Sequence, residues 1–373
     1  MARKGENIRK RSDGRWEARI YRDNKYISIY ASTYKEVKDK KNEYINKMVY
    51  SSKRTVATLL DDWINFNKPQ IKETTYEKYV LLIDKHIKPE LGNIRLNELT
   101  GIRINEFTKK KLERGNITNS KPLSAKSVTS ILSVIKSALK YGVEHEYKEI
   151  PSIFIHNPRM HDPVIKTLSD LEQKELEETL LTIKKPYVIG IWLSLYMGLR
   201  IGEVCALKWG CFDLQAQTLT IEKTMSRIHT ENSTAKTKIL IDKPKTDTSN
   251  RTIPIPFFLI NYLKENKKED DCYLLTGKKK FMEPRHYYQK YKRILKKCNL
   301  EDYNYHALRH TFATRCVEKG FDPKSLSEIL GHSNIEITLR RYVHPTMEMK
   351  KRQMDLFESD FLSGQKRGQT AKK

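Results

Sequence analysis

The segment 306-HALRHTFATRCVEKGFDPKSLSEILGHSNIEITLRRY-342 contains four residues whose side chains suit chemistry on a phosphate group. His306 and Arg309 lie three residues apart, so they share one face of a predicted helix. His332 follows Gly331 at a predicted helix end, where its side chain can project into a cleft. Tyr342 comes ten residues after His332. This pattern predicts a helical region that brings a candidate nucleophile, Tyr342, together with side chains that can assist its reaction.

Two stretches upstream add charged groups of the same kind, namely 198-GLRIGE-203 and 243-KPKT-246. Arg200 opens a predicted helix, and Glu203, one turn on, can pair with its guanidinium. A guanidinium can bind two phosphoryl oxygens at once and stays charged as negative charge grows. Lys243 and Lys245 are two residues apart, so on a strand they would share a face. Either one could supply a proton to a leaving oxygen.

The order and spacing of these motifs resemble the tyrosine recombinase family, also called the phage integrase family. Within it, the chain is most similar to the integrases of conjugative transposons and phages. The resemblance covers nearly the whole chain and is most specific between Gly198 and Tyr342. It implies a site-specific DNA recombinase that cuts and rejoins DNA through a 3′-phosphotyrosyl bond, with Tyr342 as the nucleophile.

The resemblance also implies a role for each of the other motif residues. Arg200 and Arg309 would clamp the phosphate, with Glu203 in support of Arg200. His306 would handle a proton near the tyrosine, and His332 would bond a non-bridging oxygen. Lys245 would be the general acid for the 5′ oxygen, with Lys243 as the alternative. His310 is expected to point elsewhere and to be structural.

The charge of the chain favours a polyanionic partner. Its 373 residues include 71 Lys and Arg against 46 Asp and Glu, a net charge of +25. This balance favours nucleic acid, although a merely basic solvated surface is the alternative. Residues 1–54 alone hold 16 basic and 7 acidic side chains. We therefore expect an N-terminal module that binds DNA.

The sequence favours a reducing compartment and gives no sign of a membrane partner. The five cysteines include no Cys-x-x-Cys pair, so neither a disulfide framework nor a cysteine zinc site is expected. No run reaches the roughly 20 apolar residues that span a bilayer, and the N-terminus has no secretory signal. We expect a cytoplasmic bacterial protein, associated with the nucleoid through DNA.

No cofactor and no metal is predicted. A zinc site could be proposed from four histidines, but no His-Glu-x-x-His or cysteine partner supports it. Those histidines are His306, His310, His332 and His344. A P-loop at Gly277-Lys278 would lack its first glycine and its Ser or Thr.

The hydrophobic pattern predicts a multidomain chain that is mainly α-helical with small β-sheets. Residues 1–52 form a small sheet with one helix, which resembles an arm-type DNA-binding domain. Residues 55–155 are helical and resemble a core-binding domain, in which Pro89 and Gly92 are expected to break a helix. Residues 165–361 form a mixed α+β catalytic domain, and residues 362–373 are a basic tail that we expect to be disordered.

The third segment has the most detailed expectations. Capping boxes and apolar periodicity predict helices at 170–182, 186–197 and 201–208. β-Branched runs predict strands at 218–224, 238–241 and 251–255. After Tyr342, an apolar stripe of Met347, Met354, Phe357 and Phe361 is expected on one helical face. It would pack on its own domain or, as the resemblance implies, on a neighbouring subunit.

The resemblance implies double-stranded DNA with core and arm sites as the substrate, and a homotetramer on that DNA. An excision factor and a host DNA-bending protein are the accessory partners it suggests. The alternatives are a chromosome-dimer resolvase, a type IB topoisomerase-like enzyme, and a non-catalytic DNA-binding protein on the same fold. The N-terminal basic module argues against the resolvase, and the short helical segment and paired motifs argue against the topoisomerase.

Overall fold

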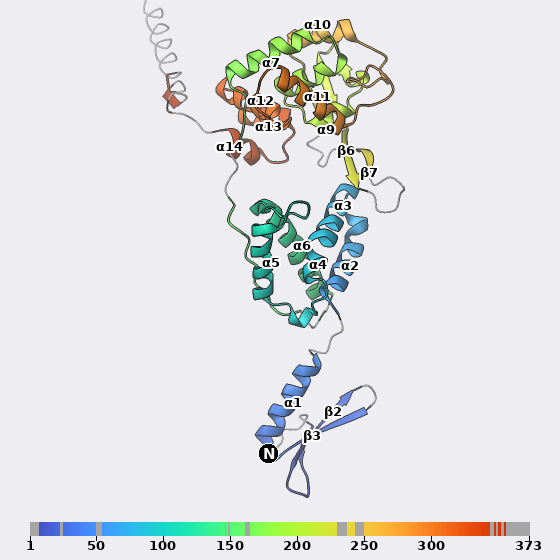
Figure 1. Cartoon of the computed structure of the whole chain (residues 1–373), viewed down its shortest axis with the longest axis vertical. Helices are drawn as coiled ribbons and strands as arrows, with labels where there is room; N and C mark the ends of the chain where they lie inside the picture. The colour runs from blue at the N-terminus through green and yellow to red at the C-terminus, as the bar shows by residue number, and fades with distance from the viewer. Residues whose placement is uncertain are drawn as a thin grey trace, which may run out of the picture. The chain divides into compact units, whose positions relative to one another are not determined.

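The computed structural model divides the chain into two compact units, Met1–Asp162 and Pro163–Lys373 (Figure 1). It describes residues 7–22, 25–49, 54–145, 147, 150–160, 165–229, 237–242, 250–343, 347, 350–351 and 354–355. Lys243, Lys245, His344 and the predicted basic tail at 362–373 lie outside these residues.

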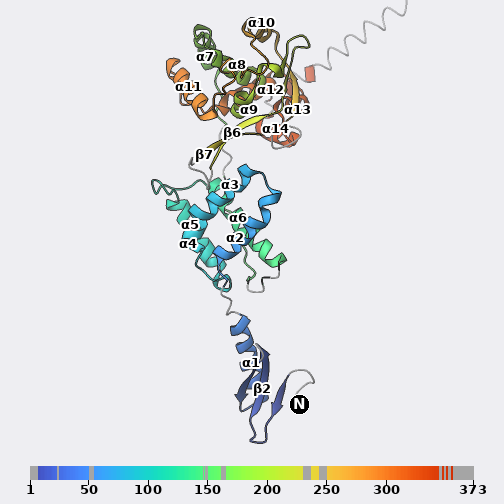
Figure 2. The same cartoon turned by 90° about the vertical axis from the view of Figure 1, so that its right-hand side faces the viewer.

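The first unit begins with a three-stranded antiparallel sheet in the order β1-β2-β3, covered on one face by α1 (Figure 2). The elements are β1 (Ile8–Lys10), β2 (Trp16–Arg22), β3 (Lys25–Ala31) and α1 (Tyr34–Val49). Gly14 has φ +86° in the turn before β2. The Glu36 N–H donates to Thr33 Oγ1 at 3.2 Å, which caps the start of α1. The small core holds Ile8, Ala18, Ala31 and Val37.

The opposite face of this sheet is built around a buried acid. Glu17 is only 1% exposed, and its carboxylate accepts from Arg9 at 2.7 Å, Arg19 at 3.1 Å and Ser28 at 2.8 Å. The hydrogen bonds from Arg9 and Ser28 lower the pKa of Glu17 to about 2. Tyr21 and Tyr26 remain exposed. The face is therefore aromatic and basic, held together by one carboxylate.

The rest of the first unit is a helical bundle with its own core. Its helices are α2 (Val56–Asn67), α3 (Glu73–Leu82), α4 (Lys88–Leu91), α5 (Gly101–Arg114) and α6 (Ala125–Glu144). Ser124 caps α6, accepting from the Ser127 N–H at 3.2 Å. The expected break at Pro89 is wrong. A π-helical turn, Ile83–Ile87, leads directly into α4. Pro89 stands in the first turn of α4, where a backbone N–H has no partner within the helix, so that the missing N–H of proline costs no hydrogen bond.

The second unit begins with helices close to the predicted ones: α7 (Asp170–Thr182), α8 (Ile189–Met197) and α9 (Ile201–Ala206). Ser169 and Glu172 form the predicted capping box of α7. Helix α9 ends two residues early because a 3-10 turn, Trp209–Cys211, follows, with the Trp209 N–H bound to the Cys272 carbonyl at 3.0 Å.

The strands that the structure describes in the second unit form two separate antiparallel sheets. One has the order β4-β5-β8, from β4 (Phe212–Asp213), β5 (Thr218–Ile221) and β8 (Arg251–Pro254). The other pairs β6 (Thr224–His229) with β7 (Thr237–Asp242). The strand expected at 218–224 is present as β5, but its expected end is wrong, because the chain leaves β5 after Ile221 and pairs with β7 from Thr224.

Five helices complete the second unit among the described residues: α10 (Phe257–Asn266), α11 (Pro284–Lys297), α12 (His306–Glu318), α13 (Pro323–Leu330) and α14 (Ile335–Tyr342). The apolar helix α8 packs against α12 and is buried along most of its length. This contact fixes α12, which carries His306 and Arg309, against the centre of the unit. Among the described residues, no helix is both long and apolar enough to cross a membrane.

Candidate active site

Arg309 lies at the centre of the site and is 1% exposed. Its two terminal nitrogens donate to the carbonyls of Gly198 and Leu330, both at 2.7 Å. Its Nε has no hydrogen-bond partner among the described residues. Burial and the neighbouring charge of Arg200 lower the pKa of Arg309 to about 9, so the group is still charged at neutral pH. A buried cation with an unused donor is suited to receive an anion.

Glu203 is 1% exposed and is shared by two arginines. Arg200 donates to one carboxylate oxygen at 2.7 Å from its side chain, and to the other at 2.9 Å from its backbone N–H. Arg251 donates to both oxygens, at 3.1 and 3.0 Å. Burial disfavours the carboxylate, but Arg251 and Arg200 outweigh it and lower the pKa of Glu203 to about 2. The predicted pairing of Arg200 with Glu203 is present in the structure.

Three arginines bind three consecutive carbonyls at the C-terminal end of α13. Arg251 Nε donates to Ile329 at 2.7 Å, Arg309 to Leu330 at 2.7 Å, and Arg200 to Gly331 at 3.2 Å. A helix C-terminus has carbonyls without hydrogen-bond partners and a partial negative charge. The guanidiniums donate to these carbonyls and balance that charge. They also fix the residue after Gly331, which is His332. Arg251 was not predicted, because nothing in its strand sequence distinguishes it from a surface residue.

Tyr342 is the last residue of α14 and is 6% exposed. Burial raises the pKa of its phenol, while Arg309 and Arg341 act in the opposite direction. Its hydroxyl lies 2.7 Å from His310 Nδ1. The expectation that His310 points elsewhere is therefore wrong.

The two predicted histidines lie on either side of this pair. His306 is exposed, and its ring contacts that of His310 with centroids 4.5 Å apart. The His332 ring is parallel to the Tyr342 ring, with centroids 6.4 Å apart. His332 Nδ1 lies 2.8 Å from the Thr338 hydroxyl. When that hydroxyl donates, the ring hydrogen sits on Nε2 and can be offered to a ligand.

The structure thus gathers Arg200, Glu203, Arg309, His332 and Tyr342 in one region of the second unit, with His306 at its edge. Lys245 and Lys243 fall outside the described residues. One group among the described residues could hold a metal ion, formed by Glu269, Asp271 and Cys272. It contains no residue of the site.

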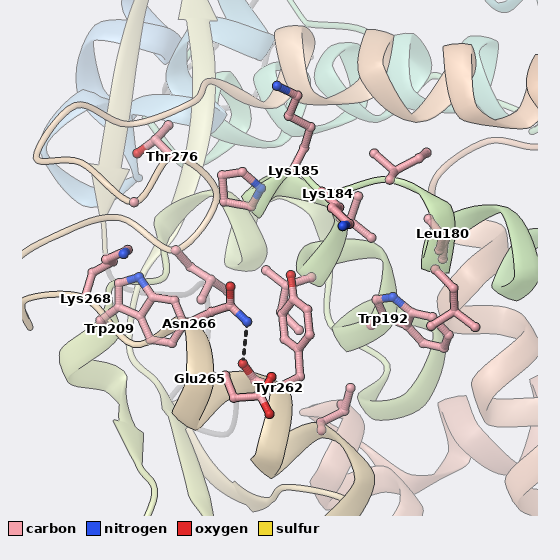
Figure 3. A pocket seen from close by; sticks show the side chains of 18 of the residues that line it. Leu180, Lys184, Lys185, Trp192, Trp209, Tyr262, Glu265, Asn266, Lys268 and Thr276 are labelled. Atoms are coloured by element: carbon pink, nitrogen blue, oxygen red, sulfur yellow. Dashed lines mark hydrogen bonds between the residues drawn. The ribbon is translucent and has the colours of Figure 1, made fainter.

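A separate pocket of about 760 Å³ lies between α7, α8 and α10 (Figure 3). Trp192, Trp209 and Tyr262 give it an aromatic lining, with Lys184 and Lys185 among its polar residues. None of the predicted catalytic residues lines it. The pocket is therefore distinct from the site around Tyr342.

Two family models match the chain. The phage integrase family matches residues 169–349, and the phage integrase N-terminal SAM-like domain matches residues 55–112. A tyrosine recombinase XerC-like protein of Caldanaerobacter subterraneus subsp. tengcongensis is 28% identical, covering 90% of this chain and 92% of the relative. The transposase from transposon Tn916 of Enterococcus faecalis is 24% identical, covering 78% and 74%.

Solved structures share the fold. The Tn1549 transposon integrase in complex with a circular intermediate DNA has a TM-score of 0.65 at 21% identity, covering 81% of this chain and 99% of that chain. A lambda integrase tetramer bound to a Holliday junction has a TM-score of 0.57 at 17% identity, covering 91% and 96%. The predicted fold class, mainly helical with small sheets, is confirmed. With the two family models together spanning well over half of its length, the chain belongs to the phage integrase family of tyrosine recombinases.

Proposed function

We propose that this protein is the site-specific integrase of a mobile element, which cuts and rejoins DNA through a 3′-phosphotyrosyl bond at Tyr342. The observation that supports it most is the position of Tyr342. Its hydroxyl is on a buried ring beside His332, and the charges of Arg309, Arg341 and Arg200 act on it. These are the groups that attack on a phosphodiester requires.

In the proposed reaction, the Tyr342 oxygen forms a bond to the scissile phosphorus while the bond to the 5′ oxygen breaks. Arg200 and Arg309 balance the charge that develops on the non-bridging oxygens, and the unused Nε of Arg309 supplies a donor. His332 donates from Nε2 to one of those oxygens. Lys245 gives the 5′ oxygen its proton, with Lys243 as the alternative. The energy of the broken bond is kept in the phosphotyrosine, so rejoining needs no nucleotide and no metal.

Double-stranded DNA is the proposed substrate. The excess of 71 basic over 46 acidic residues supports electrostatic binding to its phosphates. Residues 1–52 would bind arm sites through the basic and aromatic face of β1–β3, residues 55–155 would bind the core site, and residues 165–361 would cut it. We propose assembly as a homotetramer, by analogy with the lambda integrase tetramer on a Holliday junction. An excision factor and a host DNA-bending protein would assist, on nucleoid DNA in the bacterial cytoplasm.

The test is covalent capture on a nicked duplex carrying the element's end, analysed on a denaturing gel in the presence of a chelator. The wild-type chain should form a protein–DNA adduct, and Tyr342→Phe should form none because it lacks the attacking oxygen. Tyr262→Phe is the matched control, since this tyrosine lines the separate pocket, and it should react normally. Adduct formation by Tyr342→Phe would exclude this residue as nucleophile. Binding without any wild-type adduct would indicate a non-catalytic DNA-binding protein.

A further inference from the structure

The Tyr342 hydroxyl lies beside His310, which none of the motif roles includes, and the Arg341 side chain acts on the same hydroxyl as a hydrogen-bond donor. The distance from Nδ1 to the phenol oxygen is 2.7 Å, within the range of a good hydrogen bond. The other predicted histidines hold different positions. His332 uses its Nδ1 toward Thr338, and His306 contacts the ring of His310. A proton leaving the phenol would therefore meet His310 first.

The surroundings of His310 keep its ring neutral. It faces His306 and Arg309 from its own helix, and Tyr342 and Arg341 from α14. Burial, Arg341 and Arg309 lower its pKa to about 4, so at neutral pH one ring nitrogen has a free lone pair. When the Tyr342 O–H donates to Nδ1, the ring hydrogen is on Nε2. A bound phosphodiester would bring negative charge to this region and favour the protonated ring.

We infer that His310 is the proton acceptor for Tyr342, placed by α12 to receive the phenol hydrogen as the tyrosine attacks DNA. The inference rests on the proposed recombinase function and assigns a step within it.

In this step the proton moves from Tyr342 Oη to His310 Nδ1. The phenolate oxygen forms a bond to phosphorus, and the bond from phosphorus to the 5′ oxygen breaks, with the 5′ oxygen taking its proton from the general acid. On rejoining, the 5′ hydroxyl attacks the phosphotyrosine and His310 returns the proton to the departing phenol. His306, in ring contact with His310, would support the imidazolium rather than touch the tyrosine.

The sharpest test separates accepting a proton from holding a hydrogen bond. Asparagine can place a side-chain oxygen near the position of histidine Nδ1, but it cannot take up a proton at these pH values. We expect His310→Asn in the full-length chain to cut a nicked duplex about 10²- to 10⁴-fold more slowly at pH 7, the usual loss for a general base. Its rate should then rise roughly tenfold per pH unit, because phenolate must form before attack. The wild-type rate should be nearly flat over the same range.

A second measurement checks the cause. A fluorinated tyrosine of lower phenol pKa, placed at position 342, should speed His310→Asn more than it speeds the wild-type chain. His306→Asn is the matched comparison, expected to slow cleavage without making it depend on pH in this way. DNA binding, measured alongside, shows that each variant is folded.

Two outcomes would overturn the inference. His310→Asn with a wild-type rate and a flat pH profile would show that the residue only positions the tyrosine. A slowed His310→Asn that keeps a flat profile and gains nothing from fluorotyrosine would show a structural role. Failure of the wild-type chain itself to form an adduct would be a different result, because it removes the recombinase function together with this step.

Discussion

Arg251 shows how much of the site depends on single residues that the sequence does not mark. The pairing of Arg200 with Glu203 could be predicted because three residues make one helical turn. Arg251 binds the Glu203 carboxylate from a strand 48 positions away, and no sequence periodicity predicts such a contact. His310 could have been found, since four residues also bring it to the face of His306, but its contact with Tyr342 depends on the packing of α14.

At the residue scale we predict that Arg251→Met strongly destabilises the protein. The change leaves a buried carboxylate with one arginine instead of two, and breaking a buried pair typically costs about 3–5 kcal/mol. Hydrogen exchange on peptides from α13 should reveal faster opening, and covalent capture of DNA should decrease. Arg227→Met is the matched control, since Arg227 pairs with Glu283 at the surface and such pairs contribute about 0–1 kcal/mol. Equal effects of the two changes would contradict the role of Arg251.

Helix α13 is the element on which the site is built. It ends at Gly331 with φ +63°, and a Cβ there would lie 3.0 Å from an Arg251 terminal nitrogen. Gly320, after α12, has φ +81° but nothing within 4 Å of a Cβ. The two glycines share the backbone conformation and differ in what surrounds them.

We therefore predict that Gly331→Ala and Gly320→Ala both destabilise the chain, by about 1–3 kcal/mol for a left-handed alanine. Only Gly331→Ala should impair cleavage, because its methyl group displaces Arg251 and with it the loop that carries His332. Thermal unfolding and single-turnover cleavage of both variants test this. Comparable cleavage by the two proteins would mean that the arginine contacts at this helix end do not govern the site.

Elements with strong local signals were predictable, and those set by distant partners were not. The box at Ser169 and Glu172 fixed the start of α7 as expected. The strand expected at 218–224 ends at Ile221, because β5 and β6 have different partners, β8 and β7. The break expected at Pro89 is absent because a proline in the first turn of a helix costs no backbone hydrogen bond. No sequence pattern predicted the π-helical turn before it.

At the scale of the whole molecule, we expect the N-terminal module, residues 1–52, to bind the accessory DNA sites, and the rest of the chain to bind and cut the core site. We predict that removing residues 1–52 abolishes footprints on accessory sites while leaving core-site cleavage intact. The module has its own small core, and residues 1–54 carry 16 basic against 7 acidic side chains. Because each neutralised phosphate releases counterions, the salt dependence of binding should also become shallower. Unchanged accessory-site footprints would contradict the arm-binding role.

The stripe after Tyr342 belongs to this scale as well. Met347 and Met354, its two described members, are 79% and 67% exposed. Phe357 and Phe361 lie outside the described residues, so packing on the own domain and docking on a neighbouring subunit both stay predictions.

The arginines at the end of α13 also constrain how such an enzyme can change over evolutionary time. All three bind carbonyls at the end of α13, and Arg200 and Arg309 are also the proposed phosphate ligands, so selection for a stable fold alone would preserve them. A descendant that kept DNA binding and lost catalysis would retain these arginines and lose the Tyr342 hydroxyl, which can be removed with its ring left in place. Inactive relatives should therefore be recognised by a missing tyrosine oxygen, while their arginines look intact.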